Sequence, residues 1–167
     1  MSRTPPAYVA GHDLLAGKSV IITAAAGVGI GFAAARRCVE EGATVMISDI
    51  HERRLAEAAA RLRDIGGRPV ATQLCNVTKE DQVRALVSAA VIELGRIDVL
   101  VNNAGLGGTA RIVDMTDDQW NVVLDVTLNG TFRMTRAVLA HMLDRHAGVI
   151  VNNASVLGWR AQVGQAH

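Results

Sequence analysis

Short apolar runs alternate with longer amphipathic segments along most of this chain. Five runs rich in β-branched residues predict buried strands, at residues 19–23, 43–48, 69–74, 97–101 and 148–151. Helical spacing of apolar residues predicts helices between them, at 32–41, at 51–64, from a cap at Thr78 to Leu94, and from a capping box at Thr116 onward. Strands that are apolar throughout and alternate with helices predict an α/β fold, a doubly wound (Rossmann) parallel sheet with helices on both faces.

Composition narrows the possible functions. Residues 1–16 carry two prolines and no clear period, so we expect an N-terminal arm on the surface, where it can lie on a neighbouring subunit, followed by one domain at 17–167. A net charge of +1 gives no reason to expect a nucleic acid, and no apolar run is long enough to cross a membrane. Cys38 and Cys75 lie within apolar patterns, so we expect core packing, no metal site and a reducing, cytoplasmic compartment.

The stretch from Lys18 to Asp49 carries the strongest functional signal. It predicts a strand, a small-residue loop, a helix, a second strand and then a carboxylate. Residues 29–34 match the G-x-G-x-x-[G/A] dinucleotide pattern, and Asp49 follows about 20 residues later. Such glycines let the backbone approach a pyrophosphate at the helix N-terminus, and the carboxylate accepts from a ribose hydroxyl. The alternative, tight packing of strand and helix, explains the glycines but not the complete arrangement.

Other polar residues also follow the predicted strands. Asn76 comes after the third strand, Asn103 after the fourth and Ser155 after the fifth. The carboxyl ends of parallel strands meet at one edge, where such sheets bind their ligands. We therefore expect these residues to lie along the same edge as the glycine loop and Asp49.

These residues together resemble the short-chain dehydrogenase/reductase family from about Leu14 to His167. The likeness is carried by the glycine loop, Asp49, the sequence Asn-Asn-Ala-Gly at 102–105, and the segment 149–155 before Gly158. It implies hydride transfer between a nicotinamide cofactor and a secondary alcohol or ketone, in a homodimer or homotetramer when the protein is complete. The implied cofactor-binding residues are Ala25, Val28, Gly29, Ile30, Gly31, Asp49, Asn76, Val77, Asn103, Ala104 and Gly105. Because Asp49 would repel a 2′-phosphate, NAD is favoured over NADP.

The sequence departs from the family pattern at three positions. Ala25 stands where the family has its first loop glycine, so the turn there must suit a residue with a Cβ. Asn76 replaces an aspartate that commonly meets the adenine, although its oxygen can still accept a hydrogen bond. Thr127 replaces a catalytic asparagine, and Asn129 faces another way, so the hydroxyl or carbonyl of Thr127 would have to hold the same water. Ser155 matches the catalytic serine that hydrogen-bonds the substrate oxygen.

The family's Tyr-x-x-x-Lys motif falls about a dozen residues after this serine, and the sequence ends at His167 before it. Tyr8 is the one tyrosine present, and the fourth residue after it is a histidine. We therefore expect the 167-residue chain to be catalytically inactive. The resemblance also places a sixth strand and a helix beyond this point, so residues 149–151 should form an exposed apolar edge.

Within the family, residues 24–31, 51–55 and 152–162 are similar to actinobacterial reductases of the late stages of steroid-ring breakdown. Those enzymes act on a bicyclic hydroxyacyl-CoA, so the resemblance suggests a cyclic CoA thioester as substrate. Trp159 and Arg160 would suit its ring and its anionic tail, but packing or surface roles explain them equally well. Two alternatives stay open, a 3-oxoacyl thioester reductase of the same family and, if the chain naturally ends at residue 167, a non-catalytic nucleotide-binding module.

Overall fold

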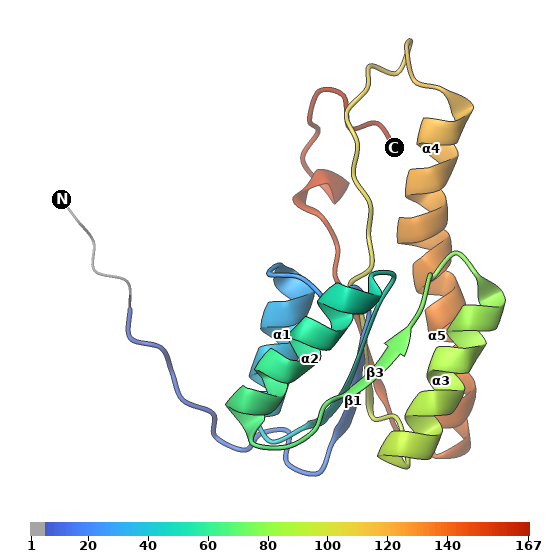
Figure 1. Ribbon diagram of the computed structural model, residues 1–167. Coiled ribbons are helices and arrows are strands. Elements are labelled where there is room, and N and C mark those ends of the chain that lie inside the picture. The colour runs from blue at the N-terminus through green and yellow to red at the C-terminus, as the bar shows by residue number, and fades with distance from the viewer. Residues whose placement is uncertain (1–5) are drawn as a thin grey trace.

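A five-stranded sheet lies between two layers of helices in the computed structural model, which describes residues 6–167 (Figure 1). The strands are all parallel, in the order β3-β2-β1-β4-β5. They are β1 (Ser19–Ile22), β2 (Thr44–Asp49), β3 (Ala71–Leu74), β4 (Val99–Asn102) and β5 (Val149–Asn152). The helices are α1 (Ile30–Glu40), α2 (Glu52–Gly66), α3 (Glu80–Leu94), α4 (Asp117–Leu124), the π-helix η1 (Asp125–Asn129), α5 (Gly130–Asp144) and the 3₁₀ turn η2 (Val156–Gly158). The predicted doubly wound fold is confirmed.

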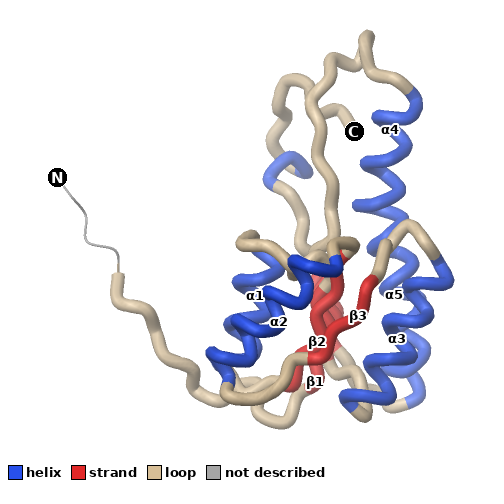
Figure 2. The backbone as a smooth tube through the Cα atoms, viewed as in Figure 1, coloured by secondary structure: helices blue, strands red, loops and turns tan. Residues whose placement is uncertain are grey.

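The sheet separates two hydrophobic cores because alternate residues of a strand point to opposite faces. Val20 and Ile22 of β1 pack with α1 and α2, whereas Ile21 packs with α3 and α5, and all three are fully buried. Figure 2 shows these helix pairs on either side of the strands. Cys75 belongs to the second core and Cys38 packs against the first, as predicted. Burial raises the pKa of the Cys75 thiol to about 11.

Most of the predicted helix ends are confirmed. Gly67 and Gly95 end α2 and α3 in the left-handed conformation, with φ of 67° and 76°. Thr116 forms the predicted capping box, in which its hydroxyl accepts from the Gln119 amide and the Gln119 side chain accepts from the Thr116 amide. These local signals work because they act within a few residues.

One helix prediction needs correction. Thr78 does not cap α3, because Lys79 occupies the N-cap position and the Thr78 hydroxyl donates instead to Oδ1 of Asn76 at 2.8 Å. The predicted long helix after Thr116 is present without a gap from Asp117 to Asp144, and it contains the π-turn η1, whose five residues include Thr127. A π-turn widens the helix by one residue, which the apolar spacing did not reveal.

The C-terminal strand leaves apolar side chains exposed. β5 is an edge strand that pairs only with β4 among the described strands, and Val149 and Val151 are 55% and 46% exposed. This agrees with the predicted apolar edge. Across residues 6–167, the structure contains no helix that is both long enough and apolar enough to cross a membrane.

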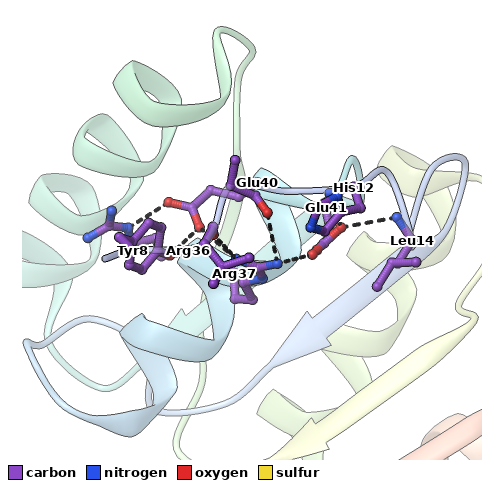
Figure 3. Close-up of polar contacts among 9 residues, drawn as sticks. Tyr8, His12, Leu14, Arg36, Arg37, Glu40 and Glu41 are labelled. Carbon is purple, nitrogen blue, oxygen red and sulfur yellow. Dashed lines mark hydrogen bonds and ion pairs between the residues drawn. The ribbon is translucent and has the colours of Figure 1, made fainter. Parts of the chain in front are cut away.

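The N-terminal arm packs on its own α1 (Figure 3). Arg37 donates to the carbonyl oxygens of Val9 at 2.6 Å and Ala10 at 3.3 Å. The buried Glu41 carboxylate accepts from the amides of His12 at 2.8 Å and Leu14 at 3.1 Å. Residues 6–16 therefore lie on the molecular surface, against α1 and Glu41 of the same chain. The part of the predicted arm at residues 1–5 lies outside the described residues, and the domain boundary at residue 16 stays a prediction.

Removing the Glu41 charge should loosen this arm. Hydrogen bonds from the His12 and Leu14 amides, together with Arg37, hold the pKa of Glu41 below its usual range despite burial. A depressed pKa stabilises the folded state above the unfolded pKa, and this contribution disappears as the pH falls through the folded pKa. We expect Glu41→Gln to lower the midpoint of thermal unfolding at pH 7, with a difference from the unmodified chain that narrows below about pH 4.

A matched control is Glu57→Gln, because Glu57 forms an exposed pair with Arg53 on α2. Such surface pairs contribute about 0.5 kcal/mol or less, so its midpoint should hardly move. Equal shifts for the two variants, or a Glu41→Gln shift that stays constant with pH, would contradict the role given to Glu41.

Candidate functional site

The candidate site lies at the carboxyl edge of the sheet, around the point where the strand order reverses. β1 pairs with β2 on one side and with β4 on the other, so the loops after β1 and β4 diverge from neighbouring strand ends. In parallel sheets this switch point forms the ligand crevice. Figure 1 shows the segments after β4 and β5 rising beyond this edge beside α4.

The glycine loop joins β1 to α1 and leaves the helix N-terminus open. Gly29 is the N-cap residue, and no side chain caps it. A Cβ placed on Gly29 would meet no atom within 4 Å, so there is space for a ligand next to the free amides. Val28 and Ile30 expose 88% and 67% of their surface beside this space.

Gly31 meets a different requirement. A Cβ at this position would lie 2.4 Å from Nδ2 of Asn103 and 2.5 Å from the carbonyl oxygen of Ala24. The first turn of α1 therefore packs directly against the loop after β4. Gly31 is thus required for close packing of two segments. Tight packing was the alternative explanation for the glycine motif at the sequence level.

The first turn of the loop accommodates the Cβ of Ala25. Ala25 is fully buried and has no positive φ, and its amide donates to the Ser48 carbonyl oxygen at 3.1 Å. The left-handed backbone belongs to Ala24, with φ of 51°. The Cβ of an L-residue is strained in that region, so Ala24 is the position at which glycine would relieve the backbone.

Asp49 closes one side of this loop. One carboxylate oxygen accepts from the Ala26 amide at 3.2 Å, and the other accepts from the His51 amide at 3.1 Å. These bonds fix the carboxylate between the glycine loop and the start of α2. Each oxygen keeps a further lone pair that can accept from a ligand hydroxyl.

Thr23 ties the glycine loop to the loop after β4. Its hydroxyl oxygen accepts from the amides of Asn103 at 3.0 Å and Ala104 at 2.9 Å. The Asn103 side chain donates back to the carbonyl oxygens of Thr23 and Ala24. Sequence analysis overlooked Thr23, although a threonine at the carboxyl end of an apolar strand is a visible signal. The structure thus brings Asn103 and Ala104 together with the glycine loop, and Gly105 follows directly.

Ser155 stands after β5 and is exposed. Its Oγ accepts from the Leu157 amide at 3.1 Å and thereby caps η2. The hydroxyl proton takes no part in this bond, so it can be donated to a ligand oxygen. The hydrogen bond from the Leu157 amide also polarises the Ser155 hydroxyl and makes it a better donor.

The Thr127 hydroxyl binds the backbone of Leu106, and its carbonyl oxygen accepts from the side-chain hydroxyl of Thr131. The Thr127 hydroxyl accepts from the Leu106 amide at 3.1 Å and lies 3.4 Å from the Leu106 carbonyl oxygen, and the Thr127 carbonyl accepts from Thr131 at 2.8 Å. Asn129 donates to Asp125 at 3.2 Å, in keeping with the prediction that it does not replace the missing asparagine. Arg133, which also binds Asp125, is the main reason that the pKa of Asp125 is low.

Asn76 and Val77 lie beyond the end of β3. They take no part in the hydrogen bonds that join the glycine loop to Asn103. Oδ1 of Asn76 accepts two hydrogen bonds from Thr78, at 3.0 and 2.8 Å, which occupy both of its lone pairs. Val77 is buried against Gly130 of α5. Within the described part of the chain, no three His, Cys, Asp or Glu side chains gather where a metal ion could bind.

Comparisons with known proteins agree with this geometry. A family model described as short chain dehydrogenase matches residues 18–167. A (5R,7aS)-5-hydroxy-7a-methyl-1-oxo-2,3,5,6,7,7a-hexahydro-1H-indene-carboxyl-CoA reductase of Mycobacterium tuberculosis is 58% identical over 163 residues, which make up 97% of this chain and 62% of the relative. The chain thus spans less than two thirds of that relative.

Two solved structures are also similar. A short chain dehydrogenase from Mycobacterium smegmatis gives a TM-score of 0.95 at 55% identity, over 98% of this chain and 69% of that one. NAD⁺-bound xylitol dehydrogenase gives a TM-score of 0.87 at 34% identity, over 92% of this chain and 58% of that one.

The strained turn generates a prediction for Ala24→Gly. Glycine adopts positive φ without the Cβ penalty, so we expect the free energy of unfolding to rise by about 1 kcal/mol. Chemical denaturation measures this change. Ala26→Gly is the matched control, because Ala26 lies in the same loop without a positive φ and its buried Cβ is lost. It should lower the free energy of unfolding, and an equal loss in both variants would contradict the assignment of strain to Ala24.

Proposed function

This chain belongs to the short-chain dehydrogenase family, and from that premise we propose that its carboxyl edge binds NAD(H) for hydride transfer between a secondary alcohol and a ketone. The observation that carries the proposal is the hydrogen-bonded junction of Thr23 with Asn103 and Ala104. It holds the glycine loop, with Asp49 beside it, against the loop that continues toward Thr127.

The residues present fit a dinucleotide. The open space at Gly29 and the free amides of α1 suit a pyrophosphate, whose negative charge the helix N-terminus favours. Ala25, Gly31, Ala104 and Gly105 would shape the walls, while Val28 and Ile30 would cover the ligand with apolar surface. When bound, the nicotinamide ring supplies or accepts the hydride.

Asp49 supports NAD over NADP. Its carboxylate is fixed at the end of β2 by two backbone amides, where it would accept from a ribose hydroxyl and repel a 2′-phosphate. For the adenine we propose Asn76 and Val77, after β3. Thr78 occupies both lone pairs of the Asn76 side-chain oxygen, and the Asn76 backbone amide donates to Gln82. The contribution of Asn76 would therefore come from its side-chain amide nitrogen.

Ser155 would orient the substrate. Its hydroxyl proton would be donated to the substrate oxygen and would stabilise negative charge that develops there. We propose that Thr127 positions the Leu106 backbone beside this site, since its hydroxyl and carbonyl both bind protein groups. The 167 residues contain no tyrosine followed by a lysine four positions later. We therefore propose that they bind cofactor and substrate, and that proton transfer requires groups outside them.

The substrate class follows from a relative. The Mycobacterium tuberculosis reductase is named for an indene-carboxyl-CoA, and at 58% identity it supports a bicyclic acyl-CoA substrate here. Apolar side chains stand exposed on the two segments beyond the sheet edge. They are Leu106, Ile112 and Val113 after β4, and Val156, Trp159 and Val163 after β5. Such surface suits a ring system better than a polar sugar.

A subunit contact completes the proposal. Large apolar side chains stand exposed at helical spacing along η1 and α5, beside a hollow of about 590 Å³ on α4 and η1. They are Leu128, Phe132, Leu139 and Leu143. An exposed stripe of this kind marks association, so we propose a homodimer or homotetramer of the complete protein.

The cysteines are free and lie on opposite faces of the sheet, which supports a reducing, cytoplasmic environment.

Cofactor preference tests the nucleotide half of the proposal. We expect the unmodified chain to bind NAD(H) more tightly than NADP(H), and Asp49→Asn to raise NADP⁺ affinity about tenfold or more. Removing a like charge at about 4 Å is worth between about 1 and 4 kcal/mol. Isothermal titration measures both affinities, and Asp64→Asn, at an exposed site on α2, should change neither. Tighter binding of NADPH than of NADH by the unmodified chain would refute the preference.

Ligand binding near Trp159 tests the substrate half. In a Trp120→Phe background, Trp159 is the sole tryptophan, and we expect its fluorescence to respond to a bicyclic keto-acyl-CoA in the presence of NAD⁺. Affinity should exceed that for a short linear 3-oxoacyl-CoA by about tenfold, because each additional buried methylene is worth roughly 1–3 kcal/mol. Stronger binding of the linear thioester would favour the 3-oxoacyl alternative. No response to either, with NAD⁺ bound, would favour a non-catalytic module.

A further inference from the structure

A series of hydrogen bonds joins the glycine loop to the turn that carries Ser155. Nδ2 of Asn103 donates to the carbonyl oxygens of Thr23 at 3.0 Å and Ala24 at 3.1 Å, and its Oδ1 accepts from Nδ2 of Asn153 at 2.9 Å. Resting on the proposed function, we propose that Asn153 is a positioning residue that couples cofactor binding in the glycine loop to the geometry of the Ser155 turn.

The Asn103 side chain is suited to transmit a displacement. Its amide group is planar, so Nδ2 and Oδ1 move as one unit. The close approach of Gly31, whose Cβ would lie 2.4 Å from that Nδ2, leaves the amide little room to rotate independently of α1. Movement of the glycine loop therefore shifts the acceptor offered to Asn153.

Asn153 is also close to Ser155, at the other end of this series of bonds. The Asn153 amide donates to the Asn102 carbonyl oxygen at 2.9 Å, which extends the pairing of β4 and β5 by one residue. Only Ala154 then separates it from Ser155, whose Oγ accepts from the Leu157 amide. The direction of the Ser155 hydroxyl thus depends on a backbone that is fixed on both its amide and side-chain sides at residue 153.

Exposure of Asn153 makes the bond responsive to a ligand. The side chain faces solvent in this structure, where water competes for its hydrogen bonds. A ligand that covers the edge excludes that water and strengthens the bond. By reciprocity, an ordered Ser155 turn raises affinity for the ligand in the loop.

Hydrogen exchange measured by mass spectrometry tests this coupling. The reporters are amides that donate within the turn, those of Leu157, Gly158, Trp159 and Arg160. Saturating NAD⁺ should slow their exchange roughly three- to tenfold in the unmodified chain, the effect of about one hydrogen bond. In Asn153→Ala the slowing should fall below about twofold, while the first turn of α1 stays protected by the cofactor.

Two further variants keep the result interpretable. Asn153→Asp preserves the shape but removes the donor, so it should also lose the slowing even if the alanine variant folds poorly. Asn121→Ala, on exposed α4, should behave as the unmodified chain.

Three outcomes oppose the proposal in different ways. Slowing that persists in both Asn153 variants would mean direct contact between ligand and turn, and would overturn it. NAD⁺ binding without slowing in the unmodified chain would overturn the coupling alone. Failure of NAD⁺ to bind would refute the proposed function, and the coupling with it.

Discussion

The hydroxyl of Thr23 and the amide of Asn103 make the junction on which the rest of the site depends. β1 and β4 are neighbours in the sheet, but their loops leave in different directions, one to α1 and the other toward α4. Thr23 accepts two backbone amides of the second loop, and Asn103 donates two bonds to the first. The two loops are thus held at a fixed separation before any ligand binds, which lowers the entropy that binding must overcome.

This junction changes the meaning of the glycine motif. Of the three glycines at 27, 29 and 31, the last lies against Asn103 and would collide with it if it carried a side chain. Gly29, in contrast, faces open space. Packing therefore explains Gly31, whereas Gly29 leaves space in which a ligand could approach the backbone.

Sequence alone predicted the features that local physics decides. The five strands, the glycine helix ends and the Thr116 capping box all depend on residues within a few positions of one another. Contacts between distant segments were beyond its reach. Neither the bond from Asn153 to Asn103, across 50 positions, nor the positive φ of Ala24 has a periodic signature. Thr78 failed as a cap because Asn76 competes for its hydroxyl.

Thr127 stands where the family pattern has an asparagine, and its hydrogen bonds show what the threonine does in this chain. A threonine side chain is shorter than that of asparagine. In this chain the Thr127 hydroxyl accepts from the Leu106 amide, and the Thr127 carbonyl oxygen accepts from the Thr131 hydroxyl. Thr127 lies in the middle of the π-turn, whose extra residue shifts the helical register locally. At this position the hydroxyl holds the loop that leads away from Asn103. Because Leu106 follows Asn103 and Ala104 closely in the sequence, anchoring it also restricts movement at the junction that these two residues form with Thr23.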